Sequence, residues 1–318
     1  MGDIQFHNHI EPKAVRYTIR DFEAQFPEDS TCLDWLWKYL YPDGAECLVC
    51  KRVTKHHRVA SRPSYSCDQC GHHVHPTAGT IFHKSTTHLR LWFYAIYLMS
   101  STRCGISAKH LERELGVTYK TAWRMFKQIR TMLNDETPFD GDKPVEIDEM
   151  FHGGVRKGGH GRKLTGDRDK VPVLGIVERK GRAVCRTISA ARSRDVLPLI
   201  KKYVMPISTV FTDESKIYDG VGHLQGTCHT HKRINHSEAV YVMGDIHTNS
   251  VEGLWSLVKN NIRGAHHSVS AKYLQMYLDE ICFRYNRRRD AQPMFMAFMQ
   301  QISKAEVKAV AVDQAVVA

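Results

Sequence analysis

Three acidic residues occupy positions from which a folded chain could bring their carboxylates together. Asp148 interrupts the strand-like run VEIDEMF, and Asp213 ends a second such run, STVFTDES, where the chain would leave a sheet. Glu252 lies on a helix that we expect to begin near Thr248. Taken singly, these acids could occupy an edge strand, a strand end and a solvated helix face. Their combination predicts one shared site.

Converging carboxylates repel one another, so such a site requires cations. Oxygen ligands of this kind suit Mg²⁺ or Mn²⁺. Two such ions about 4 Å apart can activate an attacking oxygen and stabilise the leaving oxygen of an in-line phosphoryl displacement. Lys259, seven residues after Glu252, projects from the same face of the predicted helix. The pattern therefore indicates metal-dependent phosphoryl transfer at Asp148, Asp213 and Glu252, with two ions in the site.

Four cysteines have the spacing of a structural zinc site. Cys47 and Cys50 form one C-x-x-C pair and Cys67 and Cys70 form another, with sixteen residues between the pairs. Four thiolates on two tight turns complete a closed tetrahedral site for one Zn²⁺. Histidines nearby leave open the replacement of one ligand: His56, His57, His72, His73 and His75. The other cysteines have no paired spacing and are expected to be buried: Cys32, Cys104, Cys185, Cys228 and Cys282.

The stretch GISAKHLERELGVTYKTAWRMFKQIRTML has helical spacing of apolar residues on both sides of Gly116. Two helices that cross at this turn, the second capped by Thr118, are typical of a helix-turn-helix. The outer face of the second helix is predicted to carry four basic residues that suit a DNA major groove: Lys120, Arg124, Lys127 and Arg130. The alternative is a plain helical hairpin with a solvated basic face.

The elements that must position the acids follow from apolar periodicity. Val145, Ile147 and Phe151 alternate with Glu146 and Asp148, which predicts a half-buried strand. Further strands are expected in VPVLGIVER, RAVCRTIS and STVFTDE, as in an α/β domain. The helix of Glu252 has two opposite faces. Its buried stripe is Val251, Leu254, Val258 and Ile262, and its exposed stripe is Asn249, Glu252, Ser256, Lys259 and Arg263.

Nothing in the composition contradicts a nucleic-acid enzyme. The 318 residues allow two or three domains, and 45 Lys and Arg against 34 Asp and Glu give a net charge of +11, which favours a polyanionic partner. An apolar run of about 18 residues, as a membrane span requires, is absent from the sequence. The N-terminus does not resemble a secretory signal, and nine cysteines argue against a disulfide framework. We expect a cytoplasmic protein without a membrane partner.

Composition and pattern divide the chain into five predicted segments. They are an N-terminal helical segment (1–45), a zinc ribbon (46–84), an all-α helix-turn-helix domain (85–135), an α/β catalytic domain (140–300) and a tail (301–318). The first contains a helix that Ser30 could cap, with Leu33, Leu36 and Leu40 on one face. A buried helix from Leu89 to Met99 is expected to support the helix-turn-helix. A polar linker, NDETPFDGDK, marks the boundary near residue 140.

In these motifs, the chain resembles the DDE transposases of bacterial insertion sequences. The particular group has an N-terminal zinc ribbon and an ISXO-like DDE domain, and is the insertion-sequence family numbered fifteen-ninety-five. The resemblance covers nearly the whole chain: FPEDSTCLDWLWKYLYPDG, both C-x-x-C pairs, the helix-turn-helix, EIDEMFHGG, VFTDES, HTNSVEGLWSLVKNNIRG and FRYNRRR. The knuckle CLVCK departs from the CPxCG often seen in the family.

The resemblance implies an RNase H-like fold, a mixed five-stranded sheet with flanking helices. It also implies that Asp148, Asp213 and Glu252 hold the metals and that Lys259 contacts DNA near the reacting phosphate. Some related transposases are described with Asn as the third ligand, so Asn249, one turn before Glu252, is the alternative. We favour Glu252, because a carboxylate neutralises Mg²⁺ and an amide does not.

Double-stranded DNA is the expected partner, both as the terminal inverted repeats of the element and as the target. The Gly-rich basic loop HGGVRKGGHGRKLTGDRDK is expected to lie on phosphates through Arg156, Lys157, Arg162 and Lys163, unless it is merely a hairpin tip. Arg263 on the exposed helix stripe is assigned to DNA as well. Since two ends must be joined, the enzyme should act as a homo-oligomer, at least a dimer on DNA. The alternatives are a non-catalytic DNA-binding regulator and an RNase H-like nuclease or resolvase.

Overall fold

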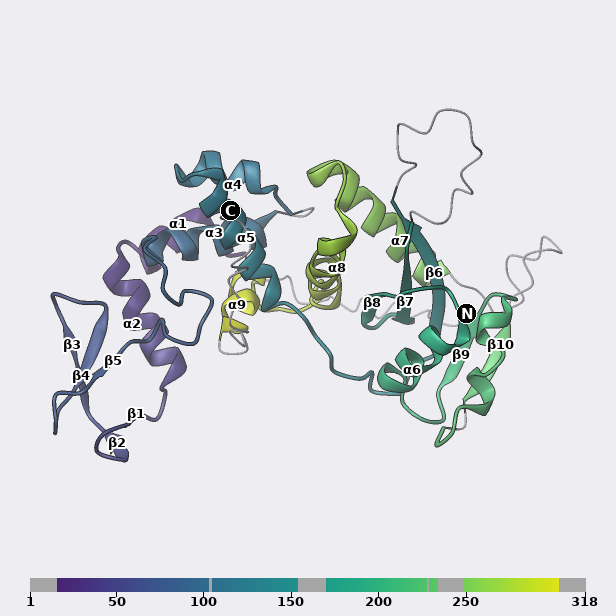
Figure 1. Ribbon diagram of the computed structural model, residues 1–318, viewed down its shortest axis with the longest axis horizontal. Helices are drawn as coiled ribbons and strands as arrows, with labels where there is room; N and C mark the ends of the chain where they lie inside the picture. The colour runs from purple at the N-terminus through teal and green to yellow at the C-terminus, as the bar shows by residue number, and fades with distance from the viewer. Residues whose placement is uncertain (1–15, 103–104, 154–169, 228, 234–248, 303–318) are drawn as a thin grey trace, which may run out of the picture. The chain divides into compact units, whose positions relative to one another are not determined.

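The chain forms two compact units in the computed structural model (Figure 1). The structure describes residues 16–102, 105–153, 170–227, 229–233 and 249–302. Unit 1 comprises residues 1–101 and 287–318, and unit 2 comprises residues 102–286. The division differs from the predicted boundaries. Residues 105–135 belong to the same unit as the α/β domain, and the chain after residue 286 belongs with the N-terminal part.

Unit 1 combines four helices with two small sheets among its described residues. Its elements are α1 (Ile19–Gln25), α2 (Asp29–Leu40), β1 (Ala45–Cys47), β2 (Arg52–Thr54), β3 (His56–Val59), β4 (Ser64–Cys67), β5 (His73–Val74), α3 (Leu89–Ser101) and α9 (Met294–Met299). Helix α2 begins at Asp29, so Ser30 lies in its first turn and is not the predicted cap. Helix α1, which the sequence analysis missed, begins with a reciprocal hydrogen-bonded cap between Thr18 and Asp21.

Aromatic side chains form the core of the helical part of unit 1. Phe26 lies edge-on to Phe93 of α3, with ring centroids 5.0 Å apart, and to Phe295 of α9 at 6.1 Å. Helix α3 is buried along one side, as predicted for Leu89 to Met99. Helix α9 had been assigned to the catalytic domain, but it packs on α3, because its Phe295 completes this aromatic cluster.

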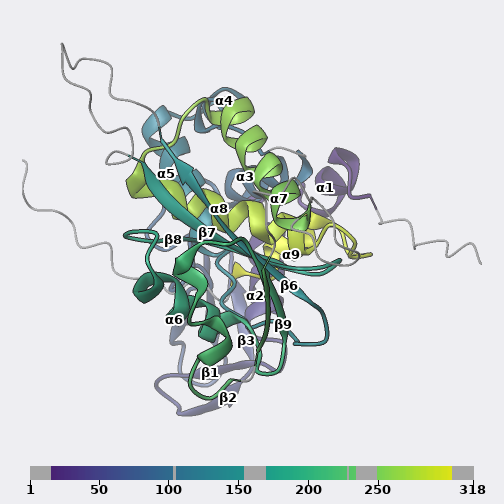
Figure 2. The same ribbon diagram turned by 90° about the vertical axis from the view of Figure 1, so that its right-hand side faces the viewer.

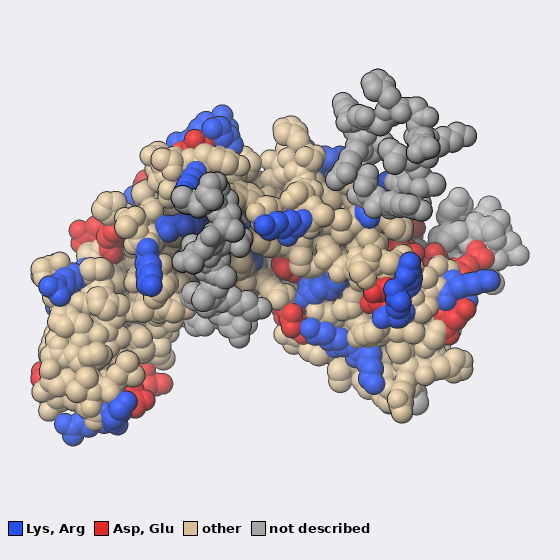
Figure 3. Space-filling model, viewed as in Figure 1, with Lys and Arg blue, Asp and Glu red and all other residues tan. Residues whose placement is uncertain are grey.

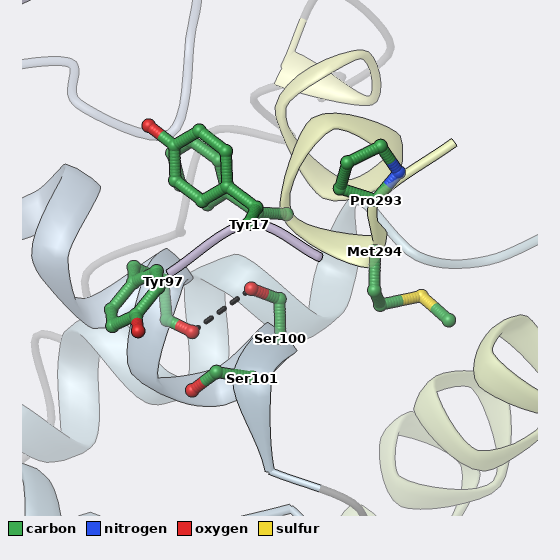
Figure 4. A pocket seen from close by; sticks show the side chains of 7 residues that line it. Tyr17, Tyr97, Ser100, Ser101, Pro293 and Met294 are labelled. Atoms are coloured by element: carbon green, nitrogen blue, oxygen red, sulfur yellow. Dashed lines mark hydrogen bonds between the residues drawn. The ribbon is translucent and has the colours of Figure 1, made fainter. Parts of the chain in front are cut away.

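A small pocket of about 130 Å³ lies in this helical part, between α3, α9 and the chain before α1 (Figure 4). Tyr17, Tyr97, Pro293 and Met294 line it together with two serines, and the Ser100 hydroxyl donates to the carbonyl of Tyr97 at 2.9 Å. All seven lining residues are uncharged. The pocket therefore offers no group suited to the phosphoryl chemistry that the sequence indicates.

A mixed five-stranded sheet forms the centre of unit 2, in agreement with the prediction (Figure 2). Its strands are β6 (Val145–His152), β7 (Val171–Glu178), β8 (Ala183–Thr187), β9 (Thr209–Thr212) and β10 (Thr230–Arg233). The order across the sheet is β10-β9-β6-β7-β8. Strands β6, β7 and β8 are antiparallel neighbours, whereas β9 runs parallel to both β6 and β10. The carboxyl ends of β6 and β9 therefore lie at one edge of the sheet.

Helices cover both faces of this sheet. Helix α6 (Ser193–Tyr203), with the 3₁₀ turns η1 (Lys216–Tyr218) and η2 (Val221–His223), packs on the face of Val145 and Ile147. Helices α7 (Asn249–Asn261) and α8 (Ala271–Asn286) pack on the other face, against Met150 and Val173. A π-helical segment, η3 (Ile262–His266), joins α7 to α8. Since both faces are covered, β6 is more deeply buried than the half-buried strand that alternation predicted.

The two predicted helices of the basic hairpin are present as α4 (Ala108–Leu115) and α5 (Tyr119–Thr131). Gly116 between them has a left-handed backbone, with φ of 63°, which glycine adopts without strain. The Thr118 side chain accepts from the amide of Thr121 at 3.3 Å, which confirms the predicted cap. Helix α5 packs on α8, where the rings of Phe126 and Tyr277 lie 6.0 Å apart.

Arg130 corrects the predicted DNA-contacting face of α5. Its side chain is 1% exposed and pairs with Glu280 of α8 at 2.6 Å. The guanidinium carbon lies 3.4 Å from the ring centroid of Phe126 and 4.0 Å from that of Tyr277. An arginine enclosed by two rings and a carboxylate cannot reach DNA in this conformation. The helical period places Arg130 on the side of α5 that faces α8. This side is buried along the C-terminal half of α5.

Candidate active site and metal centre

Two of the predicted acids lie next to each other on neighbouring parallel strands. Val145 of β6 pairs with Val210 of β9, and continuing this register by three residues places Asp148 beside Asp213. Strands in a sheet are about 4.8 Å apart, so the two side chains leave the sheet at nearly the same point. The Asp213 carboxylate accepts from the amide of Ser215 at 3.0 Å, which orients it at the strand end.

The Asp148 carboxylate is held by an indole. The Nε1–H of Trp255 on α7 donates to Oδ2 of Asp148 at 2.8 Å. Gly175, the partner of Asp148 on β7, leaves the space that the indole fills, because a Cβ at this position would lie 2.6 Å from the ring. Burial raises the pKa of Asp148, the Trp255 hydrogen bond counteracts this rise, and repulsion from Asp213 and Glu252 adds to it. The repulsion indicates that the three acids share one electrostatic environment.

Glu252 lies in the first turn of α7. The predicted stripes of this helix are confirmed: Val251, Leu254, Val258 and Ile262 are buried, and Asn249, Glu252, Ser256, Lys259 and Arg263 are exposed. Lys259 lies two turns beyond Glu252 on the exposed side. Asn249 is the first residue of the helix and is exposed as well. Repulsion from Glu252 contributes to the raised pKa of Asp148, after burial, so Glu252 lies within electrostatic range of that carboxylate.

Glu146 is a buried acid whose role the sequence analysis missed. It shares a face of β6 with Asp148 and is 0% exposed. One of its oxygens accepts from the backbone amides of Ser250 at 2.8 Å and Val251 at 3.1 Å, at the beginning of α7. The other accepts from Nε of Arg179 at 2.7 Å. The signal in the sequence was an acid two residues before Asp148, on the strand face that alternation assigns to both residues.

Glu149 is a fourth acid close to the site. Burial raises its pKa, and the Tyr218 hydroxyl, which donates a hydrogen bond to its carboxylate, opposes that rise. Asp213 and Asp148 both repel it. Strand alternation places Glu149 on the face of β6 opposite to Asp148, over η1. It therefore adds negative charge to the strand end without lying on the side from which α7 approaches.

The geometry of the three acids can be compared with what a pair of divalent ions requires. In the part of the chain that the structure describes, only the four cysteines form a group of three or more ligand residues whose ligand atoms all lie within 4.8 Å of one another. The acids are spaced more widely. Mutual repulsion of oxygen ligands is the electrostatic condition that divalent cations relieve, so the donor set fits Mg²⁺ or Mn²⁺.

The four cysteines meet between two hairpin turns of unit 1. Sγ of Cys47 lies 3.5 Å from that of Cys70, and Sγ of Cys50 lies 3.9 Å from that of Cys67. Thiolates at about 2.3 Å from a tetrahedral zinc ion are separated by about 3.8 Å, so these distances fit Zn²⁺. A hydrogen bond from the Thr54 hydroxyl lowers the pKa of Cys67 to about 6, whereas hydrogen bonds within the cluster, chiefly with Cys70, raise the pKa of Cys50 to about 12. None of the five nearby histidines belongs to this cluster.

The remaining basic residues differ in their surroundings. Lys120 and Arg124 on α5 are exposed, whereas Lys127 is partly covered and lies over the ring of Tyr273 at 5.8 Å. Arg263 is exposed on η3. The loop residues Arg156, Lys157, Arg162 and Lys163, and two of the unpaired cysteines, Cys104 and Cys228, lie outside the described residues. Acidic and basic side chains are interspersed over the face of each unit seen in Figure 3. The exposure of particular basic residues is therefore a better guide to DNA contacts than the net charge.

No helix among the described residues is long and apolar enough to span a membrane.

Comparison with known proteins gives two matches. Residues 139–286 match the family described as the ISXO2-like transposase domain, and these residues include all three acids, Lys259 and Glu146. The chain is also 29% identical over 275 residues to a protein of Halobacterium salinarum described as an uncharacterized protein in transposable element ISH50. The alignment covers 80% of this chain and 89% of that protein.

Proposed function

We propose that the chain, whose residues 139–286 match the ISXO2-like transposase domain, is a DDE transposase that cleaves the ends of its element and joins them to target DNA. The proposal is supported by the register that places Asp148 beside Asp213 at the carboxyl ends of neighbouring parallel strands, and by the repulsion that Asp213 and Glu252 exert on Asp148. The sheet order, with three antiparallel strands followed by two parallel ones, supports an RNase H-like fold for unit 2.

In this proposal Asp148, Asp213 and Glu252 hold two Mg²⁺ or Mn²⁺ ions. When bound, the ions supply activation of the attacking oxygen and stabilisation of the leaving oxygen. The protein contributes by holding the metal ligands and the DNA backbone in position. Trp255 fixes one carboxylate through its indole N–H, and Lys259 on the exposed side of α7 offers a cation to the DNA backbone near the reacting phosphate. Water first cuts each end, and the freed 3′-hydroxyl then attacks the target in the same site.

We assign DNA recognition to the exposed N-terminal half of α5. A recognition helix contacts base edges through its N-terminal residues, and Lys120 and Arg124 are exposed there. The four cysteines hold one structural Zn²⁺ in a zinc ribbon, which contributes to binding of the terminal inverted repeats. Joining two ends requires at least two copies of the chain on DNA.

The test is cleavage and joining of DNA that carries the element's own ends, with Mg²⁺ or Mn²⁺. Asp213→Ala and Glu252→Ala should abolish joined products, because each removes a ligand from the ion pair. Ser256→Ala, on the same exposed side of α7, is the matched control and should retain parental rates.

Other results would redirect the assignment. Binding of the ends without metal-dependent cleavage would favour a DNA-binding regulator, and cleavage without joining would favour a nuclease or resolvase. Cleavage that survives Glu252→Ala but not Asn249→Ala would move the third ligand to Asn249.

A further inference from the structure

The buried Glu146 carboxylate contacts the helix that carries Glu252. Helix α7 begins at Asn249, and the first amides of a helix have no partner within it. Those of Ser250 and Val251 donate to Glu146, which lies more than one hundred residues earlier in the chain. The Ser250 hydroxyl adds a third contact at 3.2 Å. The beginning of α7 is therefore fixed to β6 through these three contacts.

Arg179 extends this contact to a third element. Its guanidinium pairs with Glu146 and lies over the ring of Phe211 on β9, with the carbon 4.1 Å from the ring centroid. Its backbone amide donates to the carbonyl of Pro144, directly before β6, at 2.9 Å. We call Glu146, Arg179 and Phe211 the Glu146 network.

The network touches each element just before that element presents its acid. Glu146 lies two residues before Asp148, and Phe211 lies two residues before Asp213. Val251, whose amide is held, directly precedes Glu252. A displacement of α7 by one residue would move Glu252 by about 1.5 Å and rotate it by about 100°. Metal ligands tolerate neither change, since their distances vary by only about 0.2 Å.

Resting on the function proposed above, we propose that the buried Glu146–Arg179 pair is a positioning device that holds Asp148, Asp213 and Glu252 in mutual register. It acts through the backbone, because Glu146 is completely buried and cannot contact DNA itself. A buried ion pair is often replaceable by apolar residues of similar size without loss of stability. A role limited to stability and a role in positioning can therefore be separated.

The experiment uses the full chain and two readouts that require no catalysis. The first is hydrogen exchange at the amides of Ser250 and Val251, and the second is Mn²⁺ affinity from calorimetric titration. The variants are Glu146→Gln and the double apolar replacement of Glu146→Met with Arg179→Met. Asp279→Asn is the matched control, because it breaks another partly buried pair of unit 2, with Arg186 at 2.8 Å, that does not touch α7.

Both Glu146 variants should remain cooperatively folded, exchange the two amides at least tenfold faster and bind Mn²⁺ at least tenfold more weakly. Asp279→Asn should keep parental exchange and affinity even where it lowers the melting temperature. A folded double variant with parental exchange and parental Mn²⁺ affinity would overturn the proposal. If Asp148→Ala leaves Mn²⁺ binding of the parent unchanged, the metal site itself is wrong, and the exchange rates alone then decide whether Glu146 holds α7.

Discussion

Burial and repulsion from two neighbouring acids destabilise the ionised carboxylate of Asp148, and the hydrogen bond from the indole N–H of Trp255 stabilises it. Trp255→Phe keeps a ring in the space above Gly175 and removes only the donor. A hydrogen bond to a charged group contributes about 1.5–3 kcal/mol, so we expect the single-turnover rate of end cleavage to fall about tenfold or more. DNA affinity should not change, because the indole lies behind the carboxylate.

Gly175→Ala tests the same contact from the other side. The added methyl would lie 2.6 Å from the indole and push it away from Asp148, so the defect should resemble that of Trp255→Phe. Both rates can be measured on one DNA substrate at saturating enzyme. Parental cleavage by Trp255→Phe would show that the hydrogen bond does not position the carboxylate.

At the scale of elements, α5 is attached to α8 by a buried cluster of charges. Glu280 is 4% exposed and pairs with Arg130 at 2.6 Å and with Arg284 at 2.7 Å. Glu280→Gln would remove the carboxylate charge that pairs with the fully buried Arg130, which costs about 3 kcal/mol or more in the free energy of unfolding. Arg130→Met should cost less, because Glu280 keeps Arg284. Denaturant unfolding of the two variants measures the order, and a larger loss in Arg130→Met would contradict this account.

His266 makes the stability of this contact depend on pH. It lies against Tyr277, with ring centroids 4.7 Å apart, and burial, aided by repulsion from Arg130, lowers its pKa to about 4. The unfolded chain binds the proton near pH 6.5 and the folded chain only near pH 4. The histidine therefore lowers stability as pH falls from about 6.5 towards 4 and has no such effect above that range.

The comparison is between the parent and His266→Phe, which keeps a ring against Tyr277. The melting temperature of the parent should fall more steeply between pH 7.5 and pH 5.5 than that of the variant. Equal slopes would mean that the histidine titrates normally in the folded chain.

At the scale of the whole molecule, zinc is expected to support only part of unit 1. Strands β1 and β2 contribute few buried side chains besides Ala45 and Cys47, so the metal must supply much of their stability. Removal of zinc by a chelator should abolish hydrogen-exchange protection in residues 45–74 and leave it intact in β6 and β7. Cys50→Ser should reproduce this loss, and His75→Gln, at an exposed histidine outside the cluster, should not. Zinc content is measured in parallel by elemental analysis, and full protection in the metal-free parent would contradict the prediction.

Much of unit 2 could be predicted because periodicity and spacing depend on local sequence. The β6 strand, the stripes of α7 and the Thr118 cap are of this kind, as is the cysteine cluster in unit 1. The fate of Arg130 could not be predicted, since a basic face looks the same whether it meets water or the aromatic rings of α8. Glu146 was missed for a related reason. Alternation assigns it a face, but only tertiary structure brings the amides of α7 to that face.

The attachment of α5 to α8 has a consequence for the DNA. From Glu252 along α7 and η3 to His266, whose ring lies 5.9 Å from that of Phe126 on α5, the path is about 20 Å. That length corresponds to about six base pairs of duplex, with a few more to reach Lys120. In the proposed transposase, α5 is a recognition helix held at a set distance from the acids on the catalytic sheet. The base pairs that it reads are then expected within about one turn of the cleaved bond, and a longer spacer in the terminal repeat should displace the cut rather than be accommodated by a flexible linker.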